Sequence, residues 1–97
     1  MDHYADAVIA MVVGALERQA AARGLRVDVL QSVRELAAND EAEIALDYLV
    51  HAVNSSGLTL SQDQYDRLRA LALRLEYSDV LTDIRPERLT GPERSSP

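Results

Sequence analysis

The sequence contains no cysteine, no tryptophan and no phenylalanine, and its only aromatic residues are four tyrosines. The lack of cysteine excludes disulfide bonds and metal sites built from thiolates. Because aromatic residues are so few, any hydrophobic core must be built from leucine, valine, isoleucine and alanine. The four glycines are isolated from one another, which excludes a glycine-rich loop of the kind that cradles phosphate groups.

The composition is otherwise that of one folded domain. The 97 residues are 47% hydrophobic and 27% charged, which is typical of a globular chain and not of a disordered one. Sixteen acidic residues against ten basic ones give a net charge of −6. Phosphate backbones and anionic lipids repel such a chain, so we expect neither nucleic acid nor a membrane among its partners.

The longest apolar stretch, Ala7–Leu16, has the length of the hydrophobic part of a secretory signal. A signal also needs a basic segment before that stretch, whereas this chain has Asp2 and Asp6 there. The stretch is too short to cross a bilayer, which takes about 20 residues. We therefore expect a buried helix and a cytoplasmic protein.

The spacing of the apolar residues predicts an all-α fold, a compact bundle of about four helices. The helices are expected over residues 2–23, 29–38, 41–54 and 61–75. Gly24 is suited to ending the first helix, because glycine adopts a left-handed conformation without a steric clash. Capping boxes are expected at the starts of the other three helices, formed by the pairs Asp28–Gln31, Asp40–Glu43 and Ser61–Gln64.

The apolar residues of the first helix predict which of its faces is buried. The buried face of the first helix is expected to comprise Tyr4, Val8, Met11, Val12, Ala15 and Leu16, widened by Ile9 and Val13.

After Tyr77 the helical pattern fades, and Pro86 and Gly91-Pro92 leave room for only a short further turn over residues 77–81. Residues 1–89 are therefore expected to form a single domain, and residues 90–97 a disordered tail.

The third predicted helix has an unusual pattern. At about 100° per residue, Glu43, Asp47, His51 and Asn54 fall on one narrow stripe, with Asp40 beside it. Nearly every other position is apolar, including Ile44 and Tyr48. Such a helix is packed by neighbours on two or three sides, so we expect it to be the central helix, with one acidic ridge facing solvent.

The negative charge is concentrated in one part of the chain. Residues 28–47 contain six acidic residues and one arginine, Arg34, a net charge of −5, whereas the rest of the chain is nearly balanced. One interpretation is that acids gather at helix N-termini because they cap the helix and favour its dipole. The other is that an acidic patch steers a basic partner towards the protein. The two interpretations are compatible.

The polar residues do not form a recognisable catalytic or metal site. His51 lies one turn from Asp47, but no nucleophile is expected within reach on that face. Glu43, Asp47 and His51 lack the second histidine that a metal site of this type would use. Neither the attachment serine of a carrier protein nor a basic DNA-recognition helix is present. We therefore predict no enzymatic activity, no metal and no cofactor.

The segment Glu41-Ala-Glu-Ile-Ala45-Leu46-Asp47-Tyr-Leu49-Val resembles the Glu-x-x-x-Ala-Leu-(Glu/Asp)-x-Leu segment of the Maf-type immunity proteins, the MafI family. The stretch before it, Leu36–Asp40, and the stretch after it, Leu58–Tyr65, also fit the order and spacing of that family. The resemblance covers residues 25–76. It implies a non-catalytic cytoplasmic inhibitor that binds the effector domain of a secreted polymorphic toxin. Glu41 and Asp47 match acidic positions of the family, and Glu41 is interpreted as structural.

The predicted mechanism is occlusion of a basic surface on the toxin. The partner-binding residues are expected to be Glu35, Asp40, Glu43, Asp47 and His51, with Asp28 as a further acidic candidate. Nuclease and nucleotide-processing toxins are basic around their clefts because their substrates are anionic. Tyr48 and Tyr77 are candidate aromatic anchors, although Tyr48 suits the core equally well. The alternative is a small helical adaptor or regulator that binds a different protein.

Overall fold

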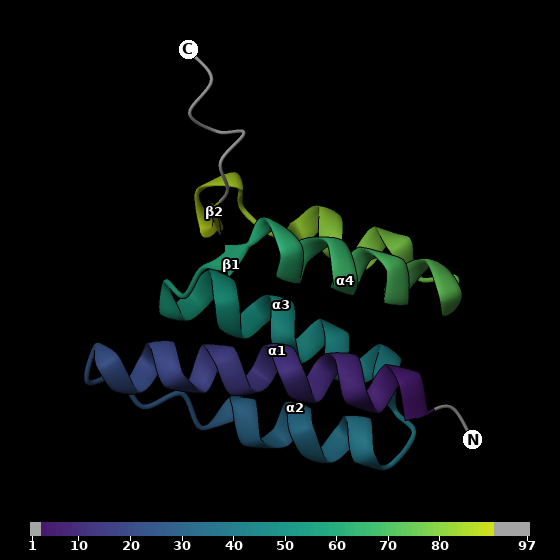
Figure 1. Cartoon of the computed structure of the whole chain (residues 1–97), viewed down its shortest axis with the longest axis horizontal. Helices are drawn as coiled ribbons and strands as arrows, with labels where there is room; N and C mark the ends of the chain where they lie inside the picture. The colour runs from purple at the N-terminus through teal and green to yellow at the C-terminus, as the bar shows by residue number, and fades with distance from the viewer. Residues whose placement is uncertain (1–2, 91–97) are drawn as a thin grey trace.

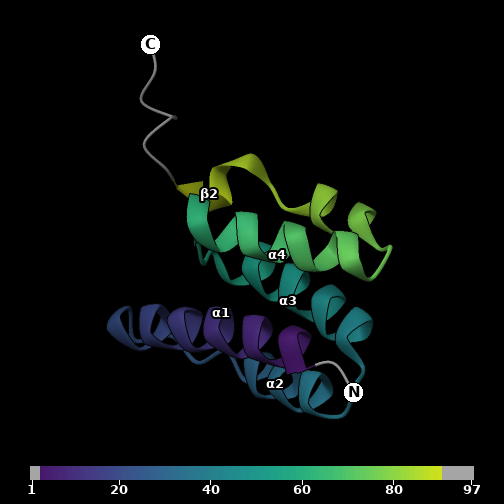
Figure 2. The same ribbon diagram turned by 45° about the vertical axis from the view of Figure 1, so that its right-hand side comes forward.

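The computed structural model describes residues 3–90, and within them the fold is all-α with four α-helices. The helices are α1 (His3–Ala22), α2 (Val29–Ala38), α3 (Ala42–Ser56) and α4 (Gln62–Arg74). Helix α3 lies between α4 on one side and the pair α1 and α2 on the other, as Figures 1 and 2 show. The predicted class, the number of helices and the central place of the third helix are confirmed.

The chain after α4 folds back along the bundle (Figure 1). It comprises two short 3₁₀ helices, η1 (Ser78–Asp83) and η2 (Pro86–Arg88), and the two-residue strand β2 (Leu89–Thr90). Strand β2 pairs in parallel with β1 (Leu60–Ser61), which immediately precedes α4. The predicted tail 90–97 lies outside the described residues except for Thr90, whose backbone belongs to β2.

The core is aliphatic, as the composition predicts. None of the buried residues within 3–90 is aromatic, charged or otherwise polar. The largest fully buried side chains come from all four helices and from the loop before α4: Ile9, Val12, Val13, Leu16, Leu30, Val33, Leu46, Leu49, Leu58, Leu60, Leu68 and Leu71. The apolar stretch 7–16 belongs to α1, and nowhere in residues 3–90 is a helix sufficiently long and apolar to traverse a bilayer.

The buried face of α1 is rotated from the predicted one. Ile9 and Val13 are fully buried, whereas Tyr4 is 39% exposed and Met11 is 42% exposed. These two residues lie at the edge of the predicted stripe, on the side away from Ile9 and Val13. The prediction was wrong for Tyr4 and Met11 because α2 and α3 pack against the opposite edge. The Tyr4 ring instead contacts Arg74 of α4, with the guanidinium 4.6 Å from the ring centre.

Three helices end in the same backbone motif. After α1, Gly24 has a φ of +70°, and the Leu25 amide donates to the Ala20 carbonyl at 2.8 Å. This is the Schellman motif, in which a left-handed residue reverses the chain and satisfies the last carbonyls of the helix. The prediction for Gly24 is confirmed. Non-glycine residues hold the same position after α2 and α4, namely Asp40 (φ +64°) and Glu76 (φ +56°).

Two of the predicted caps are wrong. Asp40 ends α2 in the left-handed region, so it cannot also take the extended conformation of an N-cap, and α3 begins after Glu41 without a side-chain cap. Asp28 has helical backbone angles (φ −62°, ψ −26°), because the chain already turns at Val27, and its side chain caps nothing. The pairs Asp28–Gln31 and Asp40–Glu43 therefore match the sequence pattern of a capping box without forming one.

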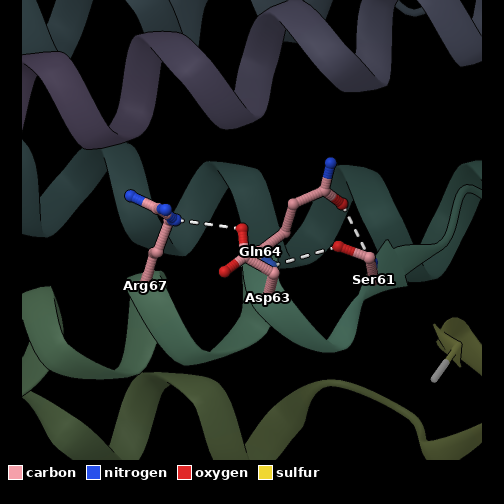
Figure 3. Close-up of polar contacts among 4 residues, drawn as sticks. All are labelled: Ser61, Asp63, Gln64 and Arg67. Carbon is pink, nitrogen blue, oxygen red and sulfur yellow. Dashed lines mark hydrogen bonds and ion pairs between the residues drawn. The ribbon is translucent and has the colours of Figure 1, made fainter. Parts of the chain in front are cut away.

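The third predicted cap is confirmed. The Ser61 hydroxyl accepts from the Gln64 amide at 3.1 Å, and the Gln64 side chain accepts from the Ser61 amide at 2.9 Å. Figure 3 shows this reciprocal pair at the start of α4, together with the ion pair between Asp63 and Arg67 one turn further on. Ser61 has the extended backbone that an N-cap requires (φ −72°, ψ 165°), because an extended stretch precedes α4.

Side chains also bind the loops to the helices. The Gln19 amide of α1 donates to the Thr59 carbonyl at 3.0 Å and accepts from the Thr59 amide at 2.8 Å. The Asn54 amide of α3 donates to the Asp83 carbonyl at 2.8 Å and accepts from the Arg85 amide at 3.1 Å. Each side chain thereby satisfies both a backbone donor and a backbone acceptor of the segment that it contacts.

Candidate functional site

The exposed side of α3 carries acidic and large apolar side chains next to one another. Its exposed side chains over residues 43–51 are Glu43, Ile44, Asp47, Tyr48 and His51, which we call the α3 face. Ile44 is 44% exposed and Tyr48 is 45% exposed. The sequence pattern predicts a single acidic ridge with Ile44 buried, and that prediction is wrong. For Tyr48 the sequence left both a core position and an exposed anchor position open, and the side chain is exposed. The α3 face is an acidic row and an apolar row side by side.

A first open hollow of about 360 Å³ lies at the start of α3. It is lined by the three acidic residues Asp40, Glu41 and Glu43 and by the apolar residues Ala42, Ile44 and Leu75. Leu75 directly follows the last residue of α4, so the hollow lies between the start of α3 and the end of α4. Two of the predicted site residues, Asp40 and Glu43, are brought together here.

A second open hollow, of about 320 Å³, lies between α2 and α3. It is lined by Tyr48 of α3 and by Ser32, Glu35, Leu36 and Asn39 from the last part of α2 and the turn after it. Glu35, another predicted site residue, is therefore separated from Asp40 and Glu43. The Ile44 side chain lines one hollow and the Tyr48 side chain lines the other.

Asp47 is bound to the chain beyond α4. The Tyr77 hydroxyl lies 2.8 and 2.9 Å from the two carboxylate oxygens of Asp47 and donates to them. This hydrogen bond raises the pKa of the Tyr77 hydroxyl above its ordinary value of 10.0. Partial desolvation and the negative charges of Asp47, Glu43 and Asp83 raise that pKa further. Tyr77 therefore acts on the site by holding a carboxylate in place.

His51 is exposed on α3, one turn beyond Asp47. No hydrogen bond or ion pair joins the two side chains, since Asp47 is oriented towards Tyr77. Asp47 and His51 are therefore not arranged as a carboxylate–imidazole pair. Among residues 3–90, no three histidine, aspartate or glutamate side chains are grouped so as to hold a metal ion.

Arg34, the one arginine within residues 28–47, does not neutralise the acidic residues of that stretch. Arg34 forms an ion pair of 2.6 Å with Glu17 of α1, on the other side of α2. Asp28 lies 3.8 Å from Arg26 and begins the turn into α2, some twelve residues or about 18 Å of helix away from Asp40. Asp28 is thus not part of the site. Within the described part of the chain, no arginine forms an ion pair with Glu35, Asp40, Glu41, Glu43 or Asp47.

Several residues of this site escaped the sequence analysis. The apolar pattern predicts that Ile44 is buried, and no site is predicted to include Leu75 or Asp83. On the helical projection Ile44 and Tyr48 follow directly after His51, on one side of the row of Glu43, Asp47 and His51, which is a signal that they can share the exposed side. Nothing in the sequence pattern indicates that Leu75, Tyr77 and Asp83 are folded back against α3.

No protein-family model matches this chain, and no curated protein or solved structure matches it either. The resemblance to the Maf-type immunity proteins therefore stays a prediction based on residues 25–76.

Proposed function

We propose that this protein is an immunity protein, which binds a cognate secreted polymorphic toxin and occludes a basic surface of its effector domain. The proposed site is the α3 face with Asp40 and Glu35 at its two flanks. The proposed compartment is the cytoplasm, where such an inhibitor protects the cell that makes the toxin. The proposed action is stoichiometric binding without catalysis, metal or cofactor.

The observation that supports this proposal is the combination of exposed apolar side chains and uncompensated carboxylates on one side of α3. Two large apolar residues are more than 40% exposed at the centre, and acidic residues surround them. Tight interfaces commonly have this arrangement, in which buried anchors slow dissociation and charges at the rim accelerate association. A toxin that acts on nucleic acids or nucleotides presents the complementary positive surface.

The test uses the protein encoded by the gene next to this one. Co-expression should restore growth to cells that produce the toxin domain, and the purified proteins should form a stable complex. The variant Glu43→Arg/Asp47→Arg should associate at least about tenfold more slowly at low salt, because it reverses the steering charge. Asp66→Arg/Glu87→Arg changes the net charge equally at exposed positions outside the α3 face and is the matched control.

An unchanged association rate for Glu43→Arg/Asp47→Arg at low salt would remove the acidic face from the mechanism. Circular dichroism and the thermal midpoint of each variant show whether the fold is retained, since Asp47→Arg also removes the hydrogen bond from Tyr77.

The alternative function is that of a helical adaptor or regulator, because the same exposed residues suit other protein partners. A neighbouring gene that encodes a large protein with a secretion module and a variable C-terminal domain favours the immunity function. The absence of such a gene favours the adaptor.

A further inference from the structure

We propose that the α3 face binds two arginine side chains of one protein partner, one in each of the hollows beside Ile44 and Tyr48. This inference rests on the proposed function and adds the chemistry of the partner surface.

The first hollow has the features that a long cationic side chain requires. It is lined by the apolar residues Ala42, Ile44 and Leu75 and by the acidic residues Asp40, Glu41 and Glu43. An arginine covers apolar surface with its methylene groups while its guanidinium stays with polar groups. A purely apolar side chain would cover the apolar lining residues but would not pair with the three acidic residues.

The second hollow favours arginine over lysine more strongly. Tyr48 supplies an exposed aromatic ring, and the Glu35 carboxylate lines the same hollow. A guanidinium is planar, so it stacks on an aromatic ring and donates to a neighbouring carboxylate oxygen at the same time, whereas an ammonium group is a compact charge that does not stack. Gln31 occupies one oxygen of Glu35 at 3.2 Å, which leaves the other oxygen as an acceptor.

The protein does not fill these hollows itself. Arg34, the nearest arginine in the sequence to Glu35, is held by Glu17 at 2.6 Å, and the carboxylates of both hollows form no ion pair within residues 3–90. The carboxylates of both hollows are therefore open to a positively charged group of a partner.

The two hollows fix the spacing of the two arginines. They lie on the two sides of α3, and Ile44 and Tyr48 are one turn apart along it. A helix with its side chains is about 10 Å across, so the two guanidinium groups stand on the order of 10 Å apart. The partner surface is expected to present two arginines at this spacing, with an apolar side chain between them to cover Ile44 and Tyr48.

The experiment uses the full chain, labelled with ¹⁵N, and a small probe in place of the toxin. The probe is N-acetylarginine methylamide, and the control probe is the corresponding citrulline compound, which is isosteric and uncharged. We expect saturable amide shift changes in residues 35–48 and at Leu75 with the arginine probe, and none with citrulline. The corresponding lysine compound should give smaller changes, above all around Tyr48.

Two single variants separate the hollows. Glu43→Gln should abolish the changes around Ile44 and Leu75 and retain those around Tyr48, whereas Glu35→Gln should do the opposite. Glu87→Gln, an equal charge change on η2, should alter neither set. Equal shifts with citrulline, or shifts spread over the acidic residues of α4 and η2, would overturn the inference.

The failure of this inference and the failure of the proposed function give different results. Binding of the arginine probe in both hollows, with no binding of the neighbouring toxin, would support the inference and refute the immunity function. A toxin complex that is insensitive to both Glu35→Gln and Glu43→Gln would refute the inference and leave the immunity function intact.

Discussion

Replacement of Gly24, the left-handed residue after α1, by alanine should destabilise the protein. Gly24 has a φ of +70°, and a Cβ built on it would meet no atom within 4 Å. The substitution therefore costs only the backbone penalty of an L-residue in this conformation, about 1–2 kcal/mol. Alanine also lowers the conformational entropy of the unfolded chain, which stabilises the folded state by about 0.4–1 kcal/mol. We expect a net loss of about 1 kcal/mol in the free energy of unfolding.

Gly14→Ala is the matched control, with the opposite sign. Gly14 lies within α1, where a Cβ would be 3.6 Å from the Arg18 guanidinium, an ordinary van der Waals distance. Alanine is favoured over glycine in a helix interior by about 0.8–1 kcal/mol. The same chemical change should thus stabilise the protein at one position of the helix and destabilise it ten residues later.

Urea unfolding followed by circular dichroism measures both effects, and the thermal midpoint should move by about 4–8 °C per kcal/mol for a chain of this size. Gly24→Asn should cost less than Gly24→Ala, because asparagine tolerates the left-handed region. If Gly24→Ala proves as stable as the wild type, then α1 does not end in a left-handed residue and the reasoning fails.

Three further predictions concern polar contacts. Ser61→Ala removes the cap of α4 and should lower the free energy of unfolding, measured in urea, by about 1 kcal/mol. Ser61→Thr should retain most of the stabilisation that the cap provides. Asn54→Asp keeps the acceptor for the Arg85 amide but replaces the donor to the Asp83 carbonyl by an oxygen, so it should destabilise the protein by about 1 kcal/mol at neutral pH, with a smaller loss below pH 4. Because the pKa of Tyr77 is raised in the folded state, its contribution to stability is present below about pH 10 and is lost as the pH rises through the folded pKa. Asp47→Asn should lower the Tyr77 pKa towards its ordinary value in a ¹³C NMR titration of the tyrosine rings, and an unchanged pKa would contradict the contact.

The sequence predicts the helices well because the apolar spacing repeats over ten or more residues in each of them. It predicts capping less well, because a capping box is a pattern of two residues that other backbone geometries also accommodate. Ser61 and Gln64 form their box because an extended stretch precedes them. Asp40 matches the same pattern, but a single residue separates it from α3, and the end of α2 already requires Asp40 in the left-handed region.

The candidate site was predicted in part. The exposed row of Glu43, Asp47 and His51 follows from the helical repeat. The contact between Tyr77 and Asp47 joins residues 30 positions apart, and no local pattern contains that information. The same holds for the Gln19 side chain, which binds Thr59 across 40 positions. Such contacts depend on how the helices pack, and the local patterns of a single sequence do not predict that packing.

The parallel pairing of β1 with β2 has a consequence for the order in which the molecule assembles. Helices α1, α2 and α3 pack mainly against their neighbours in the sequence, whereas the Leu60–Leu89 register closes a loop of 29 positions. Contacts between distant residues form more slowly, because the chain must first lose the entropy of closing the loop. We therefore expect a nascent chain to form its first three helices early and to dock η1, η2 and β2 last. In hydrogen exchange, the amides of that late segment should open at a lower free energy than those of α3.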